Sequence, residues 1–281
     1  MDLKQKTLKK EVVFHGTSLF MGLDVAVRLI PAPPGSGIVF RRVDLPHTPT
    51  IPAQTEQVRD AVRCTKVSAG EDSVQTIEHF MAAVRACEID NLIVEVSGPE
   101  MPIFDGSSLH YVELLDQAGV VEQEGGKNIF ILEEPISWSQ GDMHLIALPS
   151  DEYRISYTLH YPQSPYLRSQ YYSCVVKPET FRAEIAPCRT FTLYKEIAPL
   201  IEKGFLKNAV LDCGVVIDGD KVLNPEGVRF PDEMVRHKIL DIIGDFALLG
   251  CTFHAHLIAI KTGHAANHSV AKELRKFLRK R

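Results

Sequence analysis

Apolar residues recur every three or four positions in several stretches of the chain, with polar residues between them. Ile77, Phe80, Met81 and Val84 follow this spacing, which predicts an amphipathic helix. The predicted elements are a helix at 75–87, a strand at 92–96 and a helix at 108–118 in the first half, then a strand at 129–132, a helix at 235–249, a strand at 257–260, a turn at 262–264 and a helix at 267–278. The order helix, strand, loop, helix occurs twice, which favours a common architecture for the two halves without demonstrating a sequence repeat.

An acidic run followed by two glycines, at residues 122–127, marks a candidate domain boundary. The chain has 281 residues, enough for two domains, because a typical domain has about 150 residues. We therefore expect an N-terminal domain at 1–124 and a C-terminal domain at 127–281. Strands and helices interleave without regular βαβ alternation, and no glycine-rich nucleotide motif occurs. The sequence thus predicts an α+β fold in which each domain is a two-layer α/β sandwich.

Composition limits the partners and the location of the protein. The net charge of −5 provides no positive field for nucleic acid, so no nucleic-acid partner is expected. The most apolar stretch, 242–260, contains Asp245, His254 and His256, which are costly in lipid, so we expect no membrane span. The charged N-terminal residues do not resemble a secretory signal. We therefore expect a protein of the reducing cytoplasm, with its six cysteines free.

The last ten residues, 272–281, contain six basic side chains and one glutamate. Val270, Leu274, Phe277 and Leu278 lie at helical spacing around them, which predicts an amphipathic helix. Docking of this helix on its own domain is the favoured interpretation, and weak peripheral contact with anionic lipid is the alternative. We expect the protein to be a monomer.

Three polar residues interrupt the helix predicted at 235–249, which is otherwise apolar on nearly every side. His237, Asp241 and Asp245 follow one another at intervals of four, so their side chains project from one face. Such groups need partners in a buried helix, and a bound cation would be one. The signal is weak alone, because chance predicts about 0.6 His-x3-Asp pairs in a chain of this composition. Rival pairs with ligand spacing are His264 with His268, and His254 with His256.

Glu78 and His79 form a second polar insertion, and neighbouring residues on a helix diverge by about 100°. One of them could bind a metal while the other faces a substrate. A Zn²⁺ ion held by His79, His237 and Asp241 would have three protein ligands and one open position, as catalytic zinc sites do. Glu78 would then be placed to take a proton from an attacking water. Ligand identity alone does not select zinc, since two histidines and a carboxylate also hold the Fe(II) of non-haem oxygenases.

Six motifs, in order along the chain, carry a resemblance to a known family. They are TIEHFMAAV (76–84), DNLIVEVSGPEMPIFDGS (90–107), CRTF (188–191), LNPEGVRF (223–230), VRHKILDIIGD (235–245) and KTGHAAN (261–267). With these motifs the sequence resembles the UDP-3-O-acyl-N-acetylglucosamine deacetylases, zinc amidases that commit sugar nucleotides to lipid A in Gram-negative bacteria. The matches extend from about residue 12 to near the C-terminus.

The resemblance implies a role for each catalytic position. His79, His237 and Asp241 match the zinc ligands of the family, and Glu78 matches its general base. His264 matches a protonated histidine that stabilises the oxyanion and donates a proton to the leaving amine. Asp245 matches the carboxylate that orients this histidine. Thr190 matches the hydroxyl that assists the oxyanion, and Lys238 matches the cation beside that hydroxyl.

Substrate contacts are also implied. Lys261, expected on the strand that leads to His264, would meet the diphosphate, and a solvated lysine at the strand end is the alternative. Phe191 and Lys238 are further expected substrate contacts. An amphipathic helix predicted at 193–201 matches an insert that forms the passage for the fatty acyl chain in similar enzymes, and ordinary core packing is the alternative.

The sequence departs from the family pattern at two places. In FHGTSLFMG (14–22), Ser18 replaces a glycine and Phe20 replaces a histidine of the motif G-x-G-L-H-S-G, so any role of that histidine is absent or altered. Residues 202–208 lack one glycine of a pair that is usual in the family, which affects the expected shape of the acyl passage.

The sequence therefore predicts a two-domain zinc amidase that hydrolyses the N-acetyl group of UDP-3-O-acyl-N-acetylglucosamine, giving UDP-3-O-acyl-glucosamine and acetate. Because the ligands come from both halves, the active site is expected between the two domains. Two alternatives are a non-haem Fe(II) oxygenase and a binding module in which the metal is a structural staple. The oxygenase needs no glutamate base, and an open metal position beside Glu78 argues against the staple.

Overall fold

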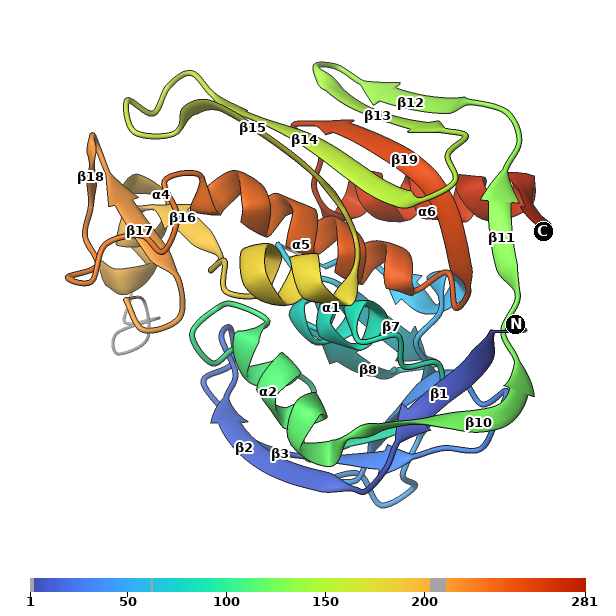
Figure 1. The fold of residues 1–281 in the computed structure, drawn as a ribbon. Helices are drawn as coiled ribbons and strands as arrows, with labels where there is room; N and C mark the ends of the chain where they lie inside the picture. The colour runs from blue at the N-terminus through green and yellow to red at the C-terminus, as the bar shows by residue number, and fades with distance from the viewer. Residues whose placement is uncertain (1–2, 62, 203–210) are drawn as a thin grey trace.

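The computed structural model describes residues 3–61, 63–202 and 211–281. Two larger sheets enclose a layer of helices (Figure 1). The sheet from the first half has the order β2-β3-β9-β4-β5, in which β4 and β9 are parallel and the other neighbours are antiparallel. Its strands are β2 (Val12–Thr17), β3 (Asp24–Pro31), β4 (Ile38–Arg42), β5 (Thr50–Pro52) and β9 (Leu92–Val96).

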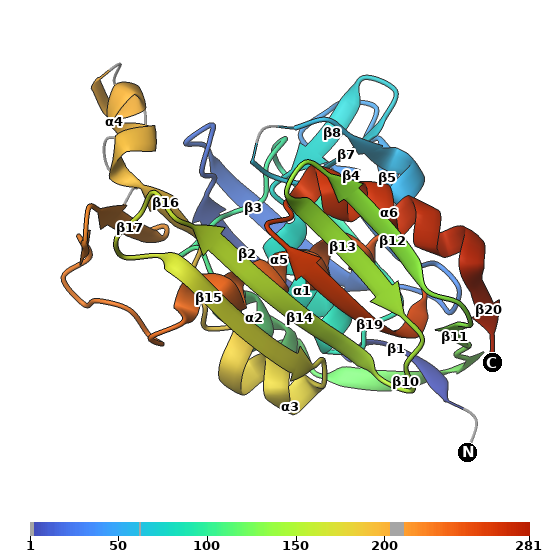
Figure 2. The ribbon, with the colours of Figure 1, turned by 90° about the horizontal axis from the view of Figure 1, so that it is seen from above.

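The sheet from the second half is built around β19 (Thr252–Ile260), which is antiparallel to β13 and parallel to β11 and β14. The further strands β12, β15 and β20 pair with β13, β14 and β11, respectively. The bounds are β11 (Ile129–Leu132), β12 (Ile136–Gln140), β13 (Met143–Leu148), β14 (Tyr153–Tyr161), β15 (Arg168–Val175) and β20 (Leu278–Lys280). Every second residue of β19 is fully buried, so one face of the sheet covers the core, and Figure 2 shows it from above.

Helices from both halves meet between the sheets. The main ones are α1 (Glu78–Ala86), α2 (Leu109–Ala118), α5 (Glu233–Ala247) and α6 (His264–Phe277). The central helix α5 is apolar on nearly every side, as predicted, and packs against α1, α6 and β14. A Cβ atom on Gly244 would lie 2.1 Å from the carbonyl oxygen of Glu78, so only glycine permits this approach of α5 to α1. The predicted α+β class is confirmed.

Smaller elements complete the described chain. They are β1 (Lys4–Leu8), β6 (Val58–Arg59), β7 (Lys66–Ala69), β8 (Asp72–Gln75), β10 (Val120–Gly126), β16 (Phe191–Leu193), β17 (Val215–Asp218), β18 (Lys221–Val222), a 3₁₀ turn (Thr55–Gln57), α3 (Pro178–Thr180) with a π turn (Phe181–Ile185), and α4 (Tyr194–Glu202). The candidate boundary at 122–127 overlaps β10, which pairs with β1. The division into domains 1–124 and 127–281 stays a prediction. None of the described helices is long and apolar enough to cross a membrane.

Three predicted starts are wrong by three residues or more, and α5 lies two residues earlier than the helix predicted at 235–249. Gln75 ends β8, and Thr76 follows with φ of 56°, so α1 begins at Glu78 and not at 75. The strand expected at 257–260 begins at Thr252, because pairing with β11 and β14 extends it toward its N-terminus. The spacing of apolar residues along the chain carries no information on pairing between distant strands. The predicted strand is therefore too short at its N-terminal end.

The closing helix also differs from its prediction. It begins at His264, inside the predicted turn, because the N–H of Asn267 donates to the carbonyl of Gly263 at 2.9 Å and closes the first turn. It ends at Phe277, and β20 begins at the next residue. This shift places His264 on the first turn of α6.

The basic C-terminal helix docks on its own chain, as the favoured interpretation predicted. Val270 and Leu274 are 1% and 0% exposed on its inner face. Arg275 pairs with Glu56 at 2.7 Å on its outer face. The interior of the protein therefore covers the apolar stripe of this helix.

Candidate active site

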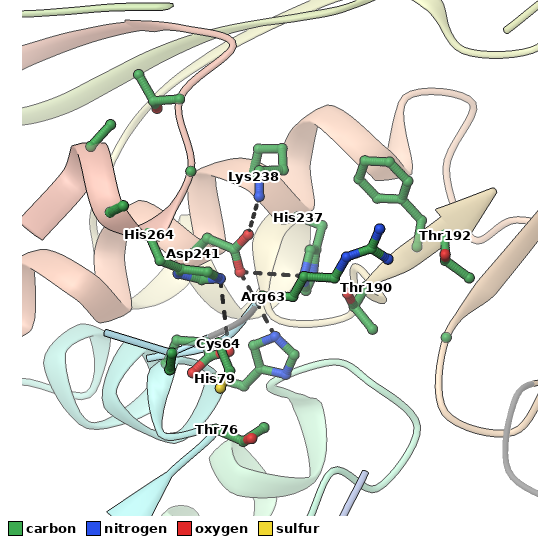
Figure 3. Close-up of a pocket in the computed structure, with 18 of the residues that line it drawn as sticks. Arg63, Cys64, Thr76, His79, Thr190, Thr192, His237, Lys238, Asp241 and His264 are labelled. Carbon is green, nitrogen blue, oxygen red and sulfur yellow. Dashed lines mark hydrogen bonds and ion pairs between the residues drawn. The ribbon is translucent and has the colours of Figure 1, made fainter. Parts of the chain in front are cut away.

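Three potential metal ligands meet where α1 packs against α5. His79 lies on α1, and His237 and Asp241 lie one turn apart on α5. Oδ1 of Asp241 is 3.3 Å from Nε2 of His237 and 3.8 Å from Nε2 of His79, and one donor atom from each residue lies within 4.8 Å of the others. All three side chains are buried (Figure 3). The structure therefore brings the predicted ligand set together from both halves of the chain.

The donor chemistry fits a divalent cation such as Zn²⁺. Burial, helped by the neighbouring ring of His237, lowers the pKa of His79 to about 3, and burial also lowers the pKa of His237. Burial alone would raise the pKa of Asp241, but the charge of Lys238 and the nearby rings hold it below its usual range. Neutral imidazoles and an ionised carboxylate are the donors that catalytic zinc sites use.

Hydrogen bonding fixes which nitrogen of His237 is available. Its Nδ1–H donates to the carbonyl of Cys188 at 3.0 Å, so Nε2 carries no proton and faces Asp241. Among the residues that the structure describes, no other group of three His, Cys, Asp or Glu donors converges in this way. Of the rival histidines, His256 bonds Ser156 on the sheet at 2.8 Å. The geometry therefore favours the His237–Asp241 pair over its rivals.

Glu78 is the first residue of α1 and is 3% exposed. Its Oε2 accepts a hydrogen bond from the backbone N–H of Thr65 at 2.9 Å, and its Oε1 lies 3.8 Å from Nε2 of His264. Burial raises the pKa of Glu78 to about 7, although the charge of His264 opposes this rise. A carboxylate with this pKa can accept and release a proton near neutral pH.

His264 is oriented by a buried carboxylate. Its Nδ1 lies 2.9 Å from Oδ2 of Asp245, which is 0% exposed. Burial alone would lower the pKa of His264, but the charge of Asp245 and its hydrogen bond raise it to about 10. His264 is therefore held in its protonated form, with Nε2 directed toward Glu78.

Lys238 and Thr190 stand on opposite sides of His237 in the cavity wall (Figure 3). The ammonium of Lys238 is 2.5 Å from Oδ2 of Asp241. Burial alone would lower the pKa of Lys238, but Asp241 raises it above its usual range, so the lysine stays charged. Thr190 precedes β16, and a Cβ on Gly214 would come within 2.8 Å of the carbonyl oxygen of Thr190, so these two backbones are in close contact.

A single cavity of about 1430 Å³, which exceeds the usual size of a small-molecule site, is lined by these side chains except that of Asp245. Phe191 lines it and packs edge-on against Tyr161, with ring centroids 6.0 Å apart. Lys261 also lines it, but follows the end of β19 with φ of 57° and pairs with Asp142. Its charge is therefore compensated, which the sequence did not predict.

The departures from the family pattern lie at or near the same cavity. Phe20 lines it and is anchored by its backbone N–H, which donates to Oε1 of Glu100 at 3.0 Å. The hydroxyl of Ser18 accepts from the N–H of Leu23 at 3.0 Å and so closes the loop between β2 and β3. The helix predicted at 193–201 is present as α4, one residue later, and its Ile197 lines the cavity. Residues 203–208 of the expected acyl passage lie outside the described residues.

Sequence reasoning missed two polar residues of the site. Besides holding Glu78, Thr65 donates from its hydroxyl to Oδ1 of Asp245 at 2.6 Å and lies 2.9 Å from Nε2 of His268. Asn267 donates to Oδ2 of Asp245 at 2.8 Å. Asn267 ends the motif KTGHAAN, which could have indicated it. Thr65 stands in no motif, so the sequence carries no signal for it.

The fold and the site together point to a class of protein. An α+β scaffold holds a buried donor set of two histidines and one aspartate, and a carboxylate and a protonated histidine face each other beside it. This combination is typical of metal-dependent hydrolases that cleave acyl bonds.

Comparison with known proteins gives the family. The model of the LpxC family, described as UDP-3-O-acyl N-acetylglycosamine deacetylase, matches residues 5–276, and the chain belongs to this family. Curated relatives named UDP-3-O-acyl-N-acetylglucosamine deacetylase are 46% identical over 275 residues in Chlamydia pneumoniae and 44% identical over 274 residues in Chlamydia caviae, each alignment covering 98% of both chains. The relative of that name from Chlamydia trachomatis serovar L2 is 40% identical over 273 residues, 96% of this chain and 94% of its own. The family predicted from the motifs is confirmed.

Proposed function

We propose that this protein is a zinc-dependent deacetylase that hydrolyses the N-acetyl group of UDP-3-O-acyl-N-acetylglucosamine, giving UDP-3-O-acyl-glucosamine and acetate for lipid A synthesis. Family membership and the names of the relatives support the reaction and the substrate. The observation that carries the metal dependence is the buried cluster of His79, His237 and Asp241 with Glu78 beside it.

The proposed metal ligands are His79, His237 and Asp241. When bound, Zn²⁺ supplies Lewis acidity toward the acetyl carbonyl and the attacking water. Lys238 binds Oδ2 of Asp241, and this contact leaves Oδ1 facing the two imidazoles. The carboxylate of Asp241 is thus held in this orientation before the metal arrives, which limits the reorganisation that binding requires.

Glu78 is the proposed general base. The backbone N–H of Thr65 holds Oε2, so Oε1 is the oxygen that faces His264 across the cavity. As water attacks the acetyl carbonyl carbon, Glu78 accepts its proton while the new C–O bond forms. The raised pKa of Glu78 matches this task at neutral pH.

His264 is the proposed general acid. Asp245 accepts from its Nδ1–H and keeps the ring protonated, so Nε2–H is available to the substrate. Nε2 donates its proton to the amide nitrogen as the C–N bond breaks, and the products are acetate and the free amino sugar. An acid and a base with separate environments thus act on the two sides of one bond.

Lys238 and Thr190 are proposed to stabilise the oxyanion. Where bound substrate excludes water, a cation and a hydroxyl in fixed positions interact with a developing negative charge more strongly than they would in water. Lys238 is held by Asp241, and the backbone of Thr190 is held by hydrogen bonds to Gly106 and Val215 at 2.8 and 2.7 Å.

The proposed substrate contacts are Phe191 and Lys261. Lys261 would exchange Asp142, whose side chain is 73% exposed, for the diphosphate. Phe191 and Ile197 line the part of the cavity next to α4, where we place the acyl chain. Cytoplasmic location, a monomeric state and peripheral lipid contact through the C-terminal helix stay predictions.

One experiment separates this function from its alternatives. Metal content per chain is measured together with acetate release from UDP-3-O-acyl-N-acetylglucosamine, with the Asp151→Ala variant as control, because that side chain is 94% exposed and outside the cavity. We expect one zinc per chain and stoichiometric acetate. An Fe(II) oxygenase would consume dioxygen and release no acetate, and a structural staple would hold metal without turnover. Either result would refute the proposal.

A further inference from the structure

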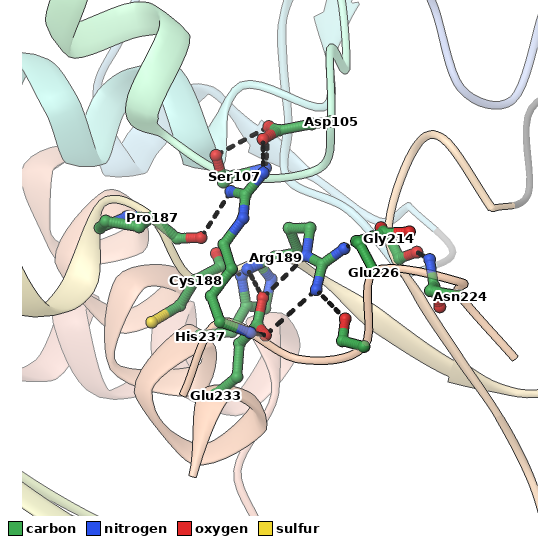
Figure 4. A network of polar contacts seen from close by, with 12 residues as sticks. Asp105, Ser107, Pro187, Cys188, Arg189, Gly214, Asn224, Glu226, Glu233 and His237 are labelled. Atoms are coloured by element: carbon green, nitrogen blue, oxygen red, sulfur yellow. Dashed lines mark hydrogen bonds and ion pairs between the residues drawn. The ribbon is translucent and has the colours of Figure 1, made fainter. Parts of the chain in front are cut away.

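A buried polar network joins the first turn of α5 to Cys188 and Arg189 (Figure 4). Its centre is the ion pair of Glu233 and Arg189, whose side chains are 0% and 3% exposed, with Oε1 and Nε 2.9 Å apart. Replacing such a pair by apolar residues is often neutral or stabilising, because taking two charges out of water costs about as much as their attraction returns. Stability alone is therefore a weak explanation for this pair.

The network reaches a proposed metal ligand through one peptide unit. Glu233, His237 and Asp241 follow at intervals of four, so they occupy successive turns on one face of α5. The peptide between Cys188 and Arg189 lies along this face. Its N–H donates to Oε1 of Glu233 at 3.0 Å, and its carbonyl accepts from Nδ1 of His237 at 3.0 Å. A continuous hydrogen-bonded chain thus leads from the carboxylate to the imidazole.

The carboxylate of Glu233 is fixed from every side. It accepts from the guanidinium of Arg189 and, at Oε2, from the backbone N–H of Arg229 at 2.6 Å. Arg189 is held in turn by the carbonyl of Gly227 at 2.7 Å and by Glu226. Glu233 is thus a fixed acceptor against which the 188–189 peptide is aligned.

We propose that Glu233 is a positioning residue that acts on the metal site through the 188–189 peptide. The Glu233 carboxylate accepts a hydrogen bond from the N–H of this peptide, and so orients and polarises the peptide. The peptide carbonyl therefore becomes a stronger acceptor for the Nδ1–H of His237. Metal-binding histidines commonly donate their second nitrogen to a carboxylate or a carbonyl, which orients the ring and raises its basicity toward the metal. Here the carboxylate of Glu233 acts on His237 through one intervening peptide. This inference rests on the proposed function, because it assumes that His237 binds the metal.

Three variants separate this role from a structural one. Glu233→Gln removes the charge that polarises the peptide and also breaks the ion pair. Arg189→Gln breaks the same ion pair but leaves the carboxylate on the peptide N–H. The double variant Arg189→Gln/Glu233→Gln removes both charges, so no unpaired buried charge opposes its folding.

The readouts are zinc affinity by competition with a chelator, the visible absorption of the Co²⁺-loaded protein, and the melting temperature of the metal-free protein. We expect zinc affinity to fall about tenfold in Glu233→Gln and in the double variant, with an altered Co²⁺ spectrum. Affinity and spectrum stay unchanged in Arg189→Gln, although its melting temperature falls. If Glu233→Gln does not fold, the double variant gives the same test.

Two results would overturn the inference. One is wild-type affinity in the variants that lack Glu233, and the other is a loss of affinity in Arg189→Gln equal to that in Glu233→Gln. A wild-type protein that binds no zinc would refute the proposed function itself, and with it this inference. Failure of the inference alone leaves wild-type zinc binding and acetate release intact, so the two failures are distinguishable.

Discussion

The two histidines of the candidate metal site are supported in different ways. His237 donates from Nδ1 to the carbonyl of Cys188, which belongs to a peptide that Glu233 holds. Nδ1 of His79 is buried and has no hydrogen-bond partner among the described residues. Its ring instead packs edge-on against that of His237, with centroids 4.9 Å apart and planes at 85°. Hydrogen bonds orient one ring, and packing orients the other.

This difference shows that the two halves of the chain contribute to the candidate site in different ways. The second half fixes the two proposed ligands on α5, each with its own polar partner. The first half brings His79 and Glu78 to these ligands on α1, through the contact of the two helices at Gly244. Changes to His237, Asp241 or their polar partners should therefore affect metal binding first. A change to Glu78 should affect the chemistry first, and a change at the contact of α1 with α5 should affect the packing first.

The largest effect is expected from Asp241→Ala. The change removes one proposed ligand and leaves the partly buried charge of Lys238 without its carboxylate. We expect the protein to lose its metal and its turnover together, as measured by elemental analysis and acetate release. Asp151→Ala is the control. Full metal content in Asp241→Ala would show that α5 does not define the metal site.

Glu78→Ala should separate chemistry from metal binding. We expect turnover to fall by roughly 10²–10⁴, the usual contribution of a general base, while one metal per chain is retained. Acetate release and metal content are measured on the same sample. Loss of metal together with turnover would mean that the two halves do not divide their roles as described.

Gly244→Ala tests the packing that joins the halves. The added Cβ would lie 2.1 Å from a backbone carbonyl, so α1 must move away from α5. Overpacking of this kind typically costs about 1–3 kcal/mol, which a lower melting temperature would report, and zinc affinity should fall with it. Gly126→Ala is the matched control, since a Cβ there meets no atom within 4 Å. An unchanged melting temperature would contradict the close contact.

The smallest effect on metal content is expected from Asp245→Asn, which should change the pH dependence of activity instead. Without this carboxylate, burial dominates and the pKa of His264 falls, so the basic limb of the activity profile moves to lower pH. The sign for stability follows from the raised pKa of His264 in the folded protein. Its contribution is complete below the ordinary value of 6.5 and is lost as pH rises through about 10. Asp245→Asn should not show this loss of stability at basic pH. A basic limb of its activity profile at the wild-type pH would contradict the assignment of Asp245 as the group that raises the pKa of His264.

The sequence predicted which residues come together in the candidate site, but not the residues that hold them in position. Spacing placed His237, Asp241 and Asp245 on one helical face, and the resemblance selected this pair of ligands from its rivals. The contacts of Thr65 with Asp245, and of Glu233 with the peptide before Arg189, join residues 180 and 44 positions apart. No local pattern reports contacts of this kind, because they arise only when α1, α5 and the loop before β16 are packed together.

The most direct test of the central claim is acetate release by protein from which the metal has been removed. The chain is treated with a chelator until elemental analysis finds no metal, and turnover is measured before and after zinc is added back. We predict no acetate release from the metal-free protein and recovery with one zinc per chain. Undiminished turnover by verified metal-free protein would contradict the claim that His79, His237 and Asp241 form the catalytic metal site.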